Sequence, residues 1–401
     1  MPILHRTKVA AATRPRNAKS GYLPTLDGWR AVAILSVILC HCRDYSFGPV
    51  GTGWFYNHGA IGVDLFFAIS GFLICSRLLE EEQTFGRISL KNFYIRRACR
   101  ILPPAFFMLS VVGVLILEGV FRITLREWLA ALFFLHNYSS LSGPLGPDTF
   151  FVNHFWSLAV EEHFYLILPA VLALTRKGWR IAALAGLTLV VEIHRVLVLR
   201  TSPWGTVGYH TGILLDYLLI PAILAVLVRN ETIRAGLKKW LRAWPLLLIV
   251  VVLLATFAGQ GAWQMTAQAA LLPLLILGTV LNARGFPARA LEWPPLRYLG
   301  RISYGVYLWQ ELFFTGHFHA ERSPLGALEH FPLQFVATFA IAIGSYYFLE
   351  KPMIRLGHRL APPATPGRGD IPEESSRRAP ISKQAGALAC APAAPEIHEH
   401  R

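Results

Sequence analysis

Apolar stretches of membrane-spanning length recur through most of this 401-residue chain, and they constrain its fold more than any other feature. A bilayer core about 30 Å thick is spanned by a helix of about 20 mainly apolar residues. Such stretches lie at ten places: 26–42, 60–78, 102–120, 155–174, 181–199, 209–228, 243–259, 265–283, 302–318 and 331–349. A shorter stretch at 128–135 is predicted to be interfacial or re-entrant. The pattern predicts an all-α, polytopic membrane helix bundle with about ten transmembrane helices.

Composition and charge placement support this interpretation. Only 15% of the residues are charged, against about 25% in a typical soluble domain. With the N-terminus in the cytoplasm, the inner segments hold 31 of the 38 Lys and Arg residues and the outer segments hold 6. This asymmetry predicts that both termini are cytoplasmic. It also accounts for the net charge of +14 without a nucleic-acid partner, for which no basic, aromatic-supported motif is present.

Three regions are expected along the chain. Residues 1–22 form a basic cytoplasmic tail, 23–357 a transmembrane domain, and 358–401 a Pro- and Ala-rich cytoplasmic tail expected to be disordered. The five cysteines are odd in number and predict no disulfide framework. No metal site is predicted, because the three consecutive residues Cys40–Cys42 point in different directions on a helix.

An arginine and a histidine lie inside the first apolar stretch, where ionisable groups are costly and tend to mark function. Arg30 and His41 are eleven residues apart, which is about 1,100° of helix and leaves them within about 20° of one face. Their separation along the axis is about 16 Å, roughly half a bilayer. The pair suggests a charge anchor near one membrane surface and a proton-transfer group near the other. The alternative is that His41 only bonds a neighbouring helix.

Two carboxylates are predicted to lie in the outer half with His41. Asp64 follows the start of the second apolar stretch and Glu161 lies early in the fourth, both on helices predicted to run inward. Ser157 and Tyr165 are four residues to either side of Glu161 and share its face. Either carboxylate is a candidate to orient the His41 imidazole and stabilise its charged form. Otherwise Asp64 is a helix cap and Glu161 an interhelical pairing group.

Two further arginines are predicted on the cytoplasmic side. Arg97 and Arg100 are one turn apart, just before a Pro-Pro pair that opens the third helix. The donor fork of a guanidinium matches phosphate oxygens, although both residues also fit the plain positive-inside pattern. With Arg30 they suit a donor with a phosphate-rich head and a long thin arm, such as acyl-CoA. His41 would then take the proton from an acceptor hydroxyl arriving from outside.

Six sequence blocks, in order along the chain, resemble those of the acyltransferase-3 family. Its members are membrane-bound O-acyltransferases that modify polysaccharides, peptidoglycan, lipopolysaccharide and some small glycosylated metabolites. The blocks are the Arg30-x10-His41 pair, GVDLFFAISGF at 62–72, FYIRRACRILPP at 93–104, WSLAVEEHFYL at 156–166, LGRISYGVYLWQ at 299–310 and SYYFLEKPMIR at 345–355.

The resemblance implies roles for several residues. His41 is the expected catalytic residue and Glu161 a functional carboxylate. The expected donor-site residues are Arg30, Arg97 and Arg100. The other candidates for the site are Asp64, Ser157, Trp156 and Tyr165.

The resemblance also implies the partners. The co-substrate is acyl-CoA, taken as acetyl-CoA, and no tightly bound cofactor is expected. The acceptor is a hydroxyl of a glycan, a lipid-linked sugar or a glycosylated small molecule. The protein is expected to be multi-pass in a bacterial inner membrane, in contact with membrane lipid.

The chain departs from the family pattern at three positions. The family often has an arginine two residues before the aspartate of helix six and a glycine five residues after it, where this chain has Leu214 and Pro221 around Asp216. The family often has a histidine where this chain has Gln310. We therefore assign no role to Asp216 or Gln310. A polar cluster at 192–195 either lines the acceptor entrance or marks the membrane interface.

Two other classes of protein fit parts of the pattern. A polytopic transporter of a sugar or acyl-linked substrate would also have about ten helices with buried charge, although transporters usually show paired repeats with broken helices. A non-catalytic scaffold would not need both the Arg30–His41 pair and the cytoplasmic arginines. The residues together favour an O-acyltransferase.

Overall fold

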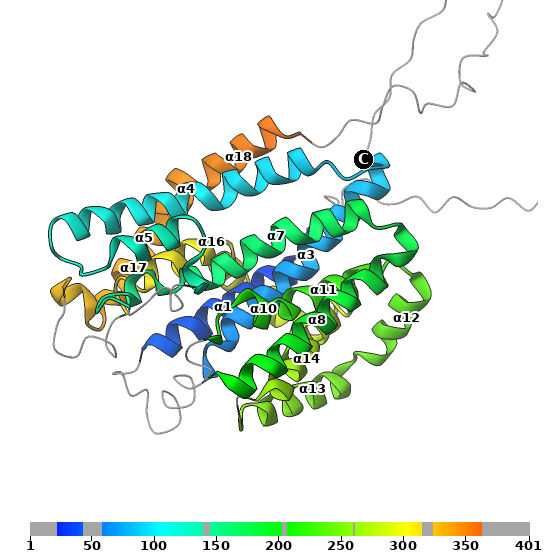
Figure 1. Cartoon of the computed structure of the whole chain (residues 1–401). Helices are drawn as coiled ribbons and strands as arrows, with labels where there is room; N and C mark the ends of the chain where they lie inside the picture. Colours follow the sequence, from blue (N-terminus) through cyan, green and yellow to red (C-terminus); the bar gives the residue numbers. More distant parts are fainter. Residues whose placement is uncertain are drawn as a thin grey trace, which may run out of the picture. The chain divides into compact units, whose positions relative to one another are not determined.

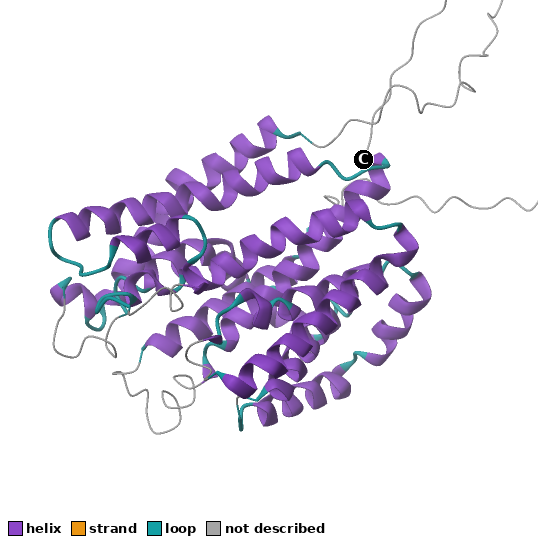
Figure 2. Ribbon diagram, viewed as in Figure 1, coloured by secondary structure: helices purple, strands orange, loops and turns teal. Residues whose placement is uncertain are grey.

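The computed structural model describes residues 22–42, 58–138, 145–202, 207–259, 261–314 and 324–362, and these contain helices and no strand (Figure 2). The chain divides into a unit at 1–364 and a short unit at 365–401. The second unit lies outside the described residues, as do residues 1–21 of the predicted N-terminal tail and 363–401 of the predicted C-terminal tail. The predicted fold class, all-α, is confirmed for the described residues.

The described residues form a series of helices along the chain (Figure 1). The first half of the chain contains α1 (Pro24–His41), α3 (Ile61–Phe85), α4 (Leu90–Leu117), α5 (Leu125–Leu132), α6 (Phe150–Asn153), α7 (Phe155–Leu174), η2 (Lys177–Trp179) and α8 (Arg180–Thr201). The second half contains α10 (Thr211–Leu214), α11 (Asp216–Leu227), α12 (Glu231–Trp240), α13 (Ala243–Thr256), α14 (Ala262–Leu281), α15 (Phe286–Leu291), α16 (Pro294–Gln310), η3 (Gly326–Glu329), α17 (Leu333–Ser345), η4 (Tyr346–Glu350) and α18 (Lys351–Leu360).

Six helical runs in the described residues are long and apolar enough to cross a membrane. A seventh crossing is possible at α12 and α13 if that pair, bent by 77°, counts as one span. Each of the ten predicted stretches contains a helix, but the predicted count of about ten transmembrane helices is not confirmed. The shortfall has physical causes: α1 carries Asp27 and Arg30, α16 has 17 residues, and the sixth stretch breaks into α10 and the 12-residue α11.

The centre of the bundle is built by close helix contacts. Helix α1 packs on α16 and α3, α3 packs on α11, and α18 packs along α4 (Figure 1). Small residues allow these approaches, as is common between membrane helices. A Cβ added at Gly300 of α16 would lie 1.8 Å from the carbonyl oxygen of Asp27 in α1, and one at Gly71 of α3 would lie 2.2 Å from that of Leu218 in α11. The positions of α1 and α16 therefore depend on each other.

The short apolar stretch predicted to be interfacial or re-entrant forms the eight-residue helix α5. Thr124 and Glu127 make a capping box at its start. The Glu127 carboxylate is fully buried, and it accepts a hydrogen bond of 2.9 Å from the backbone of Gly146 and another from the Thr149 hydroxyl. Helix α5 thus holds the segment that leads into α6 and α7, and so fixes where His154 lies.

We predict that Gly300→Ala lowers the midpoint of thermal unfolding of the detergent-solubilised protein. The added methyl group meets backbone atoms that cannot rotate away, and such overpacking typically costs about 1–3 kcal/mol. Gly186→Ala in α8 is the matched control, because a Cβ there meets nothing within 4 Å. An equal midpoint in both variants would contradict the close α1–α16 contact.

Candidate active site

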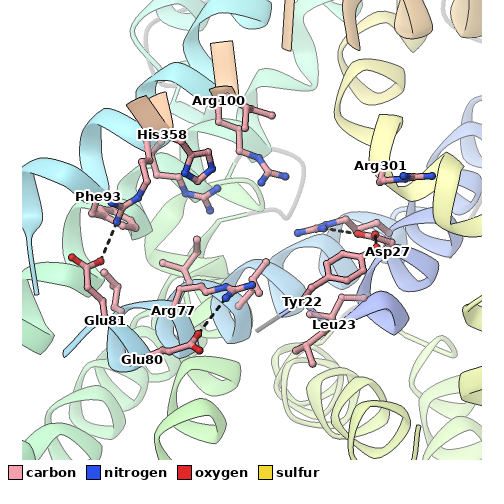
Figure 3. A pocket seen from close by; sticks show the side chains of 18 of the residues that line it. Tyr22, Leu23, Asp27, Arg77, Glu80, Glu81, Phe93, Arg100, Arg301 and His358 are labelled. Carbon is pink, nitrogen blue, oxygen red and sulfur yellow. Dashed lines mark hydrogen bonds and ion pairs between the residues drawn. The ribbon is translucent and has the colours of Figure 1, made fainter. Parts of the chain in front are cut away.

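A large basic cavity opens at the end of the bundle where α1 and α4 begin and α3 ends. Its volume is about 750 Å³. Figure 3 shows Arg100 extending into it, with Arg77 and Arg301 approaching from other helices. The cavity is lined by six arginines, namely Arg30, Arg77, Arg96, Arg97, Arg100 and Arg301. We call this cavity the vestibule.

Half of the vestibule arginines are neutralised by acidic neighbours. The pairs and their N–O distances are Arg30–Asp27 at 3.1 Å, Arg77–Glu80 at 3.2 Å and Arg96–Glu81 at 3.0 Å. Within the described residues, Arg97, Arg100 and Arg301 have no carboxylate at ion-pair distance. The vestibule therefore holds three guanidiniums outside any ion pair, although Glu161 and Glu350 lie within electrostatic reach of Arg100. Guanidiniums in an open cavity are suited to bind phosphate groups.

A narrower cavity of about 120 Å³ continues from the vestibule into the bundle, and the two share several lining residues. We call it the inner cavity. It brings together six residues singled out from the sequence: Arg30, Arg97, Arg100, Ser157, Glu161 and Tyr165. The Arg97 guanidinium lies 4.1 Å from the centroid of the Tyr165 ring, a cation–π contact. The three arginines expected at the donor site thus line one cavity.

Glu161 lies on the donor side of this arrangement. Its carboxylate accepts hydrogen bonds from the Ser70 hydroxyl at 2.7 Å and the Tyr165 hydroxyl at 3.0 Å. Glu161 is seven residues beyond His154 along α7, which is about 10 Å of helix. The position expected for Glu161, beside His41, is therefore not the one that the structure gives it.

The inner cavity ends at two hydroxyl groups. Ser157 Oγ and Tyr307 Oη are 2.5 Å apart and share one hydrogen bond, and the hydroxyl that accepts it is free to donate to the carbonyl oxygen of His154, which lies 3.0 Å from Ser157 Oγ and 3.3 Å from Tyr307 Oη. The rings of His154 and Tyr307 meet edge to face with centroids 5.6 Å apart. Ser157, a candidate from the sequence, is thus the link between the inner cavity and His154.

A buried carboxylate lies between His154 and His41. Glu311 follows directly after α16, and its side chain is 4% exposed. One Glu311 oxygen lies 2.7 Å from His154 Nδ1, and the other lies 3.9 Å from His41 Nε2. The backbone N–H of His154 also donates to Glu311, at 3.0 Å. The carboxylate beside His41 is therefore Glu311 rather than Asp64 or Glu161.

The remaining candidates lie in a third cavity. Asp64 and Trp156 both line a separate space of about 260 Å³ near the start of α3. Asp64 also lies within electrostatic reach of Arg195 and Asp216. Asp64 thus shares the His41 end of the bundle, as expected, but faces α8 and α11.

The polar cluster at 192–195, for which the sequence allowed two interpretations, pairs with Asp216. Arg195 and Asp216 are fully buried and form an ion pair between α8 and α11, and Glu192 lies 3.5 Å from the same guanidinium. Thr266 of α14 donates to Glu192 at 2.5 Å. This arrangement joins three helices. It also gives Asp216 a guanidinium partner although Leu214 stands where the family often has arginine.

Sequence reasoning missed Glu311 and His154. Both carry a signal that was available, since an ionisable residue at the end of an apolar stretch is a functional candidate by default. Glu311 follows the block LGRISYGVYLWQ, and His154 lies two residues before WSLAVEEHFYL.

A helical bundle with several membrane-length apolar helices, a basic cavity at one end and a His–Glu centre beyond it is suited to transfer a group between the two sides of a membrane. The chain belongs to the acyltransferase-3 family: the family model described as "Acyltransferase domain" matches residues 23–349. This assignment confirms the resemblance and favours an acyltransferase over a transporter or a scaffold.

Similar proteins carry O-acetyltransferase names. The chain is 30% identical over 363 residues to YrhL of Bacillus subtilis (strain 168), which has the provisional name peptidoglycan O-acetyltransferase. It is 27% identical over 368 residues to O-acetyltransferase OatA of Staphylococcus aureus (strain NCTC 8325 / PS 47). These matches cover 84% of this chain but 56% and 58% of the relatives, so the chain spans little more than half of their length. No solved structure matches the chain.

We predict that Arg97→Ala and Arg100→Ala each weaken binding of coenzyme A tenfold or more. Each removes a charge-assisted contact of about 1.5–3 kcal/mol. Arg359→Ala is the control, because Arg359 is exposed on α18 and lines neither cavity. Isothermal titration of the purified protein measures the dissociation constant. An unchanged constant in both cavity variants would remove these arginines from the donor site.

Proposed function

We propose that this protein is an integral membrane O-acyltransferase that moves an acyl group from acyl-CoA to a hydroxyl of a glycan or glycosylated acceptor. The observation that carries the proposal is the line of groups from the arginines of the vestibule, through Ser157 and Tyr307, to the His154–Glu311–His41 centre. Family membership supports the reaction class.

Coenzyme A fits the two connected cavities by its chemistry. Its phosphates suit the guanidiniums of Arg97, Arg100 and Arg301. Its thin pantetheine arm suits the narrow inner cavity, whose aromatic and aliphatic lining includes Phe66 and Tyr304. The arm would carry the thioester towards His154 and Glu311. Acetyl-CoA is the simplest such donor, and the relatives' O-acetyltransferase names support it.

His41 would act as the general base. It takes the proton from the acceptor hydroxyl while the hydroxyl oxygen bonds to the thioester carbonyl carbon. When the carbon–sulfur bond breaks, the imidazolium returns this proton to the departing thiolate, which leaves as the free thiol of coenzyme A. Glu311, at ion-pair distance from His41, would stabilise the imidazolium between these steps. His154 shares the same carboxylate and holds it in place.

The orientation follows from the same arrangement. Acyl-CoA is made inside cells, so the vestibule would face the cytoplasm, and the two chain termini would lie on that side. The 31-to-6 division of Lys and Arg residues supports this orientation. His41 would then lie towards the outside, where glycans of the cell envelope are found. Peptidoglycan is the acceptor class in the name of the Bacillus relative, and we propose a cell-envelope glycan here.

We predict that His41→Ala and His41→Gln lower the turnover of acyl transfer by about 10²- to 10⁴-fold, the usual contribution of a general base. Glutamine keeps the shape and hydrogen bonding of the side chain but has no basic nitrogen, so it should fail equally. The KM for acyl-CoA should stay near the wild-type value, because the arginines that bind it are unchanged.

The control for these variants is His330→Gln, since His330 is exposed and lines none of the three cavities. It should retain wild-type turnover. If His41→Gln kept more than about a tenth of the turnover, general-base catalysis by His41 would be untenable. Production of free coenzyme A that depends on acceptor is the readout that separates an acyltransferase from a transporter.

A further inference from the structure

The third cavity, at the His41 end of the bundle, has the lining of a carbohydrate site. Its volume is about 260 Å³. It lies between the start of α3, the segment before α10, the end of α13 and the start of α14. Flat aromatic rings and hydrogen-bonding side chains alternate around it, among them Asp64, Trp156, Tyr209, Tyr217, Gln264 and Gln268.

This cavity differs from the vestibule in the charge of its lining residues. No Lys or Arg of the described residues lines it, whereas six arginines line the vestibule. Asp64 and Glu81 mark the two ends of α3 and are seventeen residues apart, which is about 26 Å of helix. The protein thus offers a basic site at one end and a site without basic lining residues at the other. A neutral, hydroxyl-rich ligand fits the second site better than an anionic headgroup does.

Two aromatic side chains form part of the wall of this cavity. The rings of Trp156 and Tyr209 pack on each other with centroids 4.6 Å apart and planes tilted by 33°, and Tyr209 is 39% exposed. Trp156 also makes an edge-to-face contact with Phe67 of α3. Ligand pockets are mostly apolar and aromatic with a few placed polar groups, and a pyranose ring presents apolar faces with hydroxyls at its edge.

The polar side chains can bond those hydroxyls. Gln264 Oε1 is buried and has no hydrogen-bond partner within the described residues, which is costly unless a ligand or water supplies one. Gln268 is held by Tyr217 at 3.1 Å and Thr256 at 3.0 Å. The Asp64 carboxylate adds acceptors on the α3 side.

The cavity is also close to the catalytic centre. Tyr209, at its edge, lies within electrostatic reach of the Glu311 carboxylate. The Tyr209 hydroxyl can donate a hydrogen bond. Tyr209 thus connects the lining of this cavity with the surroundings of Glu311.

We infer that this cavity binds one neutral pyranose ring of the acceptor, packed against the Trp156–Tyr209 pair and bonded by Asp64 and Gln264. The identification of this sugar as part of the acceptor rests on the proposed function, whereas the binding of a sugar to the cavity does not. At about 260 Å³ the cavity is below the roughly 300–1,000 Å³ of drug-sized sites, so it suits a single ring rather than an extended chain.

The test uses direct binding of N-acetylglucosamine and its β-1,4-linked disaccharide and trisaccharide to the purified protein in lipid nanodiscs. Saturation-transfer NMR detects the contact, and isothermal titration gives the dissociation constant. Trp156→Ala, Tyr209→Ala and Gln264→Leu should each raise that constant tenfold or more. Trp156→Phe keeps a ring and should retain most of the binding. Trp263→Ala is the matched control, because Trp263 neighbours Gln264 on α14 but is 66% exposed and outside the cavity.

The possible outcomes separate this inference from the proposed function. Loss of sugar binding in the three cavity variants, with unchanged coenzyme A binding and a normal Trp263→Ala control, supports the inference. No saturable binding of any of the sugars to the wild type, or equal binding by all variants, overturns it even if acyl transfer occurs. Specific sugar binding without acyl transfer would instead overturn the proposed function and leave the inference standing. Among the three cavity variants, Tyr209→Ala is expected to fold normally, because the Tyr209 side chain is exposed enough to be truncated without opening the core.

Discussion

The contact between α1 and α16 determines both ends of the site. Helix α1 carries Arg30 in its first half and His41 at its end, and α16 carries Arg301 just before its middle and is followed directly by Glu311. Gly300 lets the two backbones approach so closely that a single methyl group would not fit between them. One helix pair thus places two arginines at the vestibule and the His41–Glu311 pair at the far end.

Buried charges are the main energetic cost of this arrangement, and they are paired differently at the two ends of the bundle. Towards the His41 end, each buried carboxylate has partners: Glu311 is shared by two histidines, and Asp216 pairs with Arg195. At the vestibule, three guanidiniums have no carboxylate at ion-pair distance within the described residues. Breaking a buried pair is strongly destabilising, whereas an unpaired cation in an open cavity is available to a ligand. This difference is consistent with the proposed donor site at the vestibule.

Much of this site could be predicted from the sequence, because helical periodicity is strict. The RRACR run and the spacing of Arg30 and His41 led us to expect Arg30 beside Arg97 and Arg100, and the three residues line the same two cavities. The partner of His41 could not be found in this way. Helical spacing says which residues share a face of one helix, but Glu311 reaches His41 from α16 and His154 reaches it from the start of α7.

The count of spans was the weakest part of the prediction for a related reason. Mean hydropathy is averaged over a window of residues and carries no information about breaks in a helix. It therefore does not reveal that α10 and α11 are separate helices or that α12 and α13 meet at an angle of 77°. The third cavity was also beyond sequence reasoning. Asp64 and Trp156 belong to helices that are far apart in the sequence. That they line the same cavity is known only from the packing of α3, α7, α13 and α14 in space.

The central claim is that a single donor molecule reaches from the vestibule arginines to the His41–Glu311 centre. A non-hydrolysable thioether analogue of acyl-CoA with a photoreactive diazirine at its acyl end tests this directly. After irradiation, mass spectrometry should find the label within residues 38–42 or 150–157, and Arg97→Ala should abolish labelling. Labels confined to residues 73–100, or labelling unaffected by Arg97→Ala, would contradict the claim.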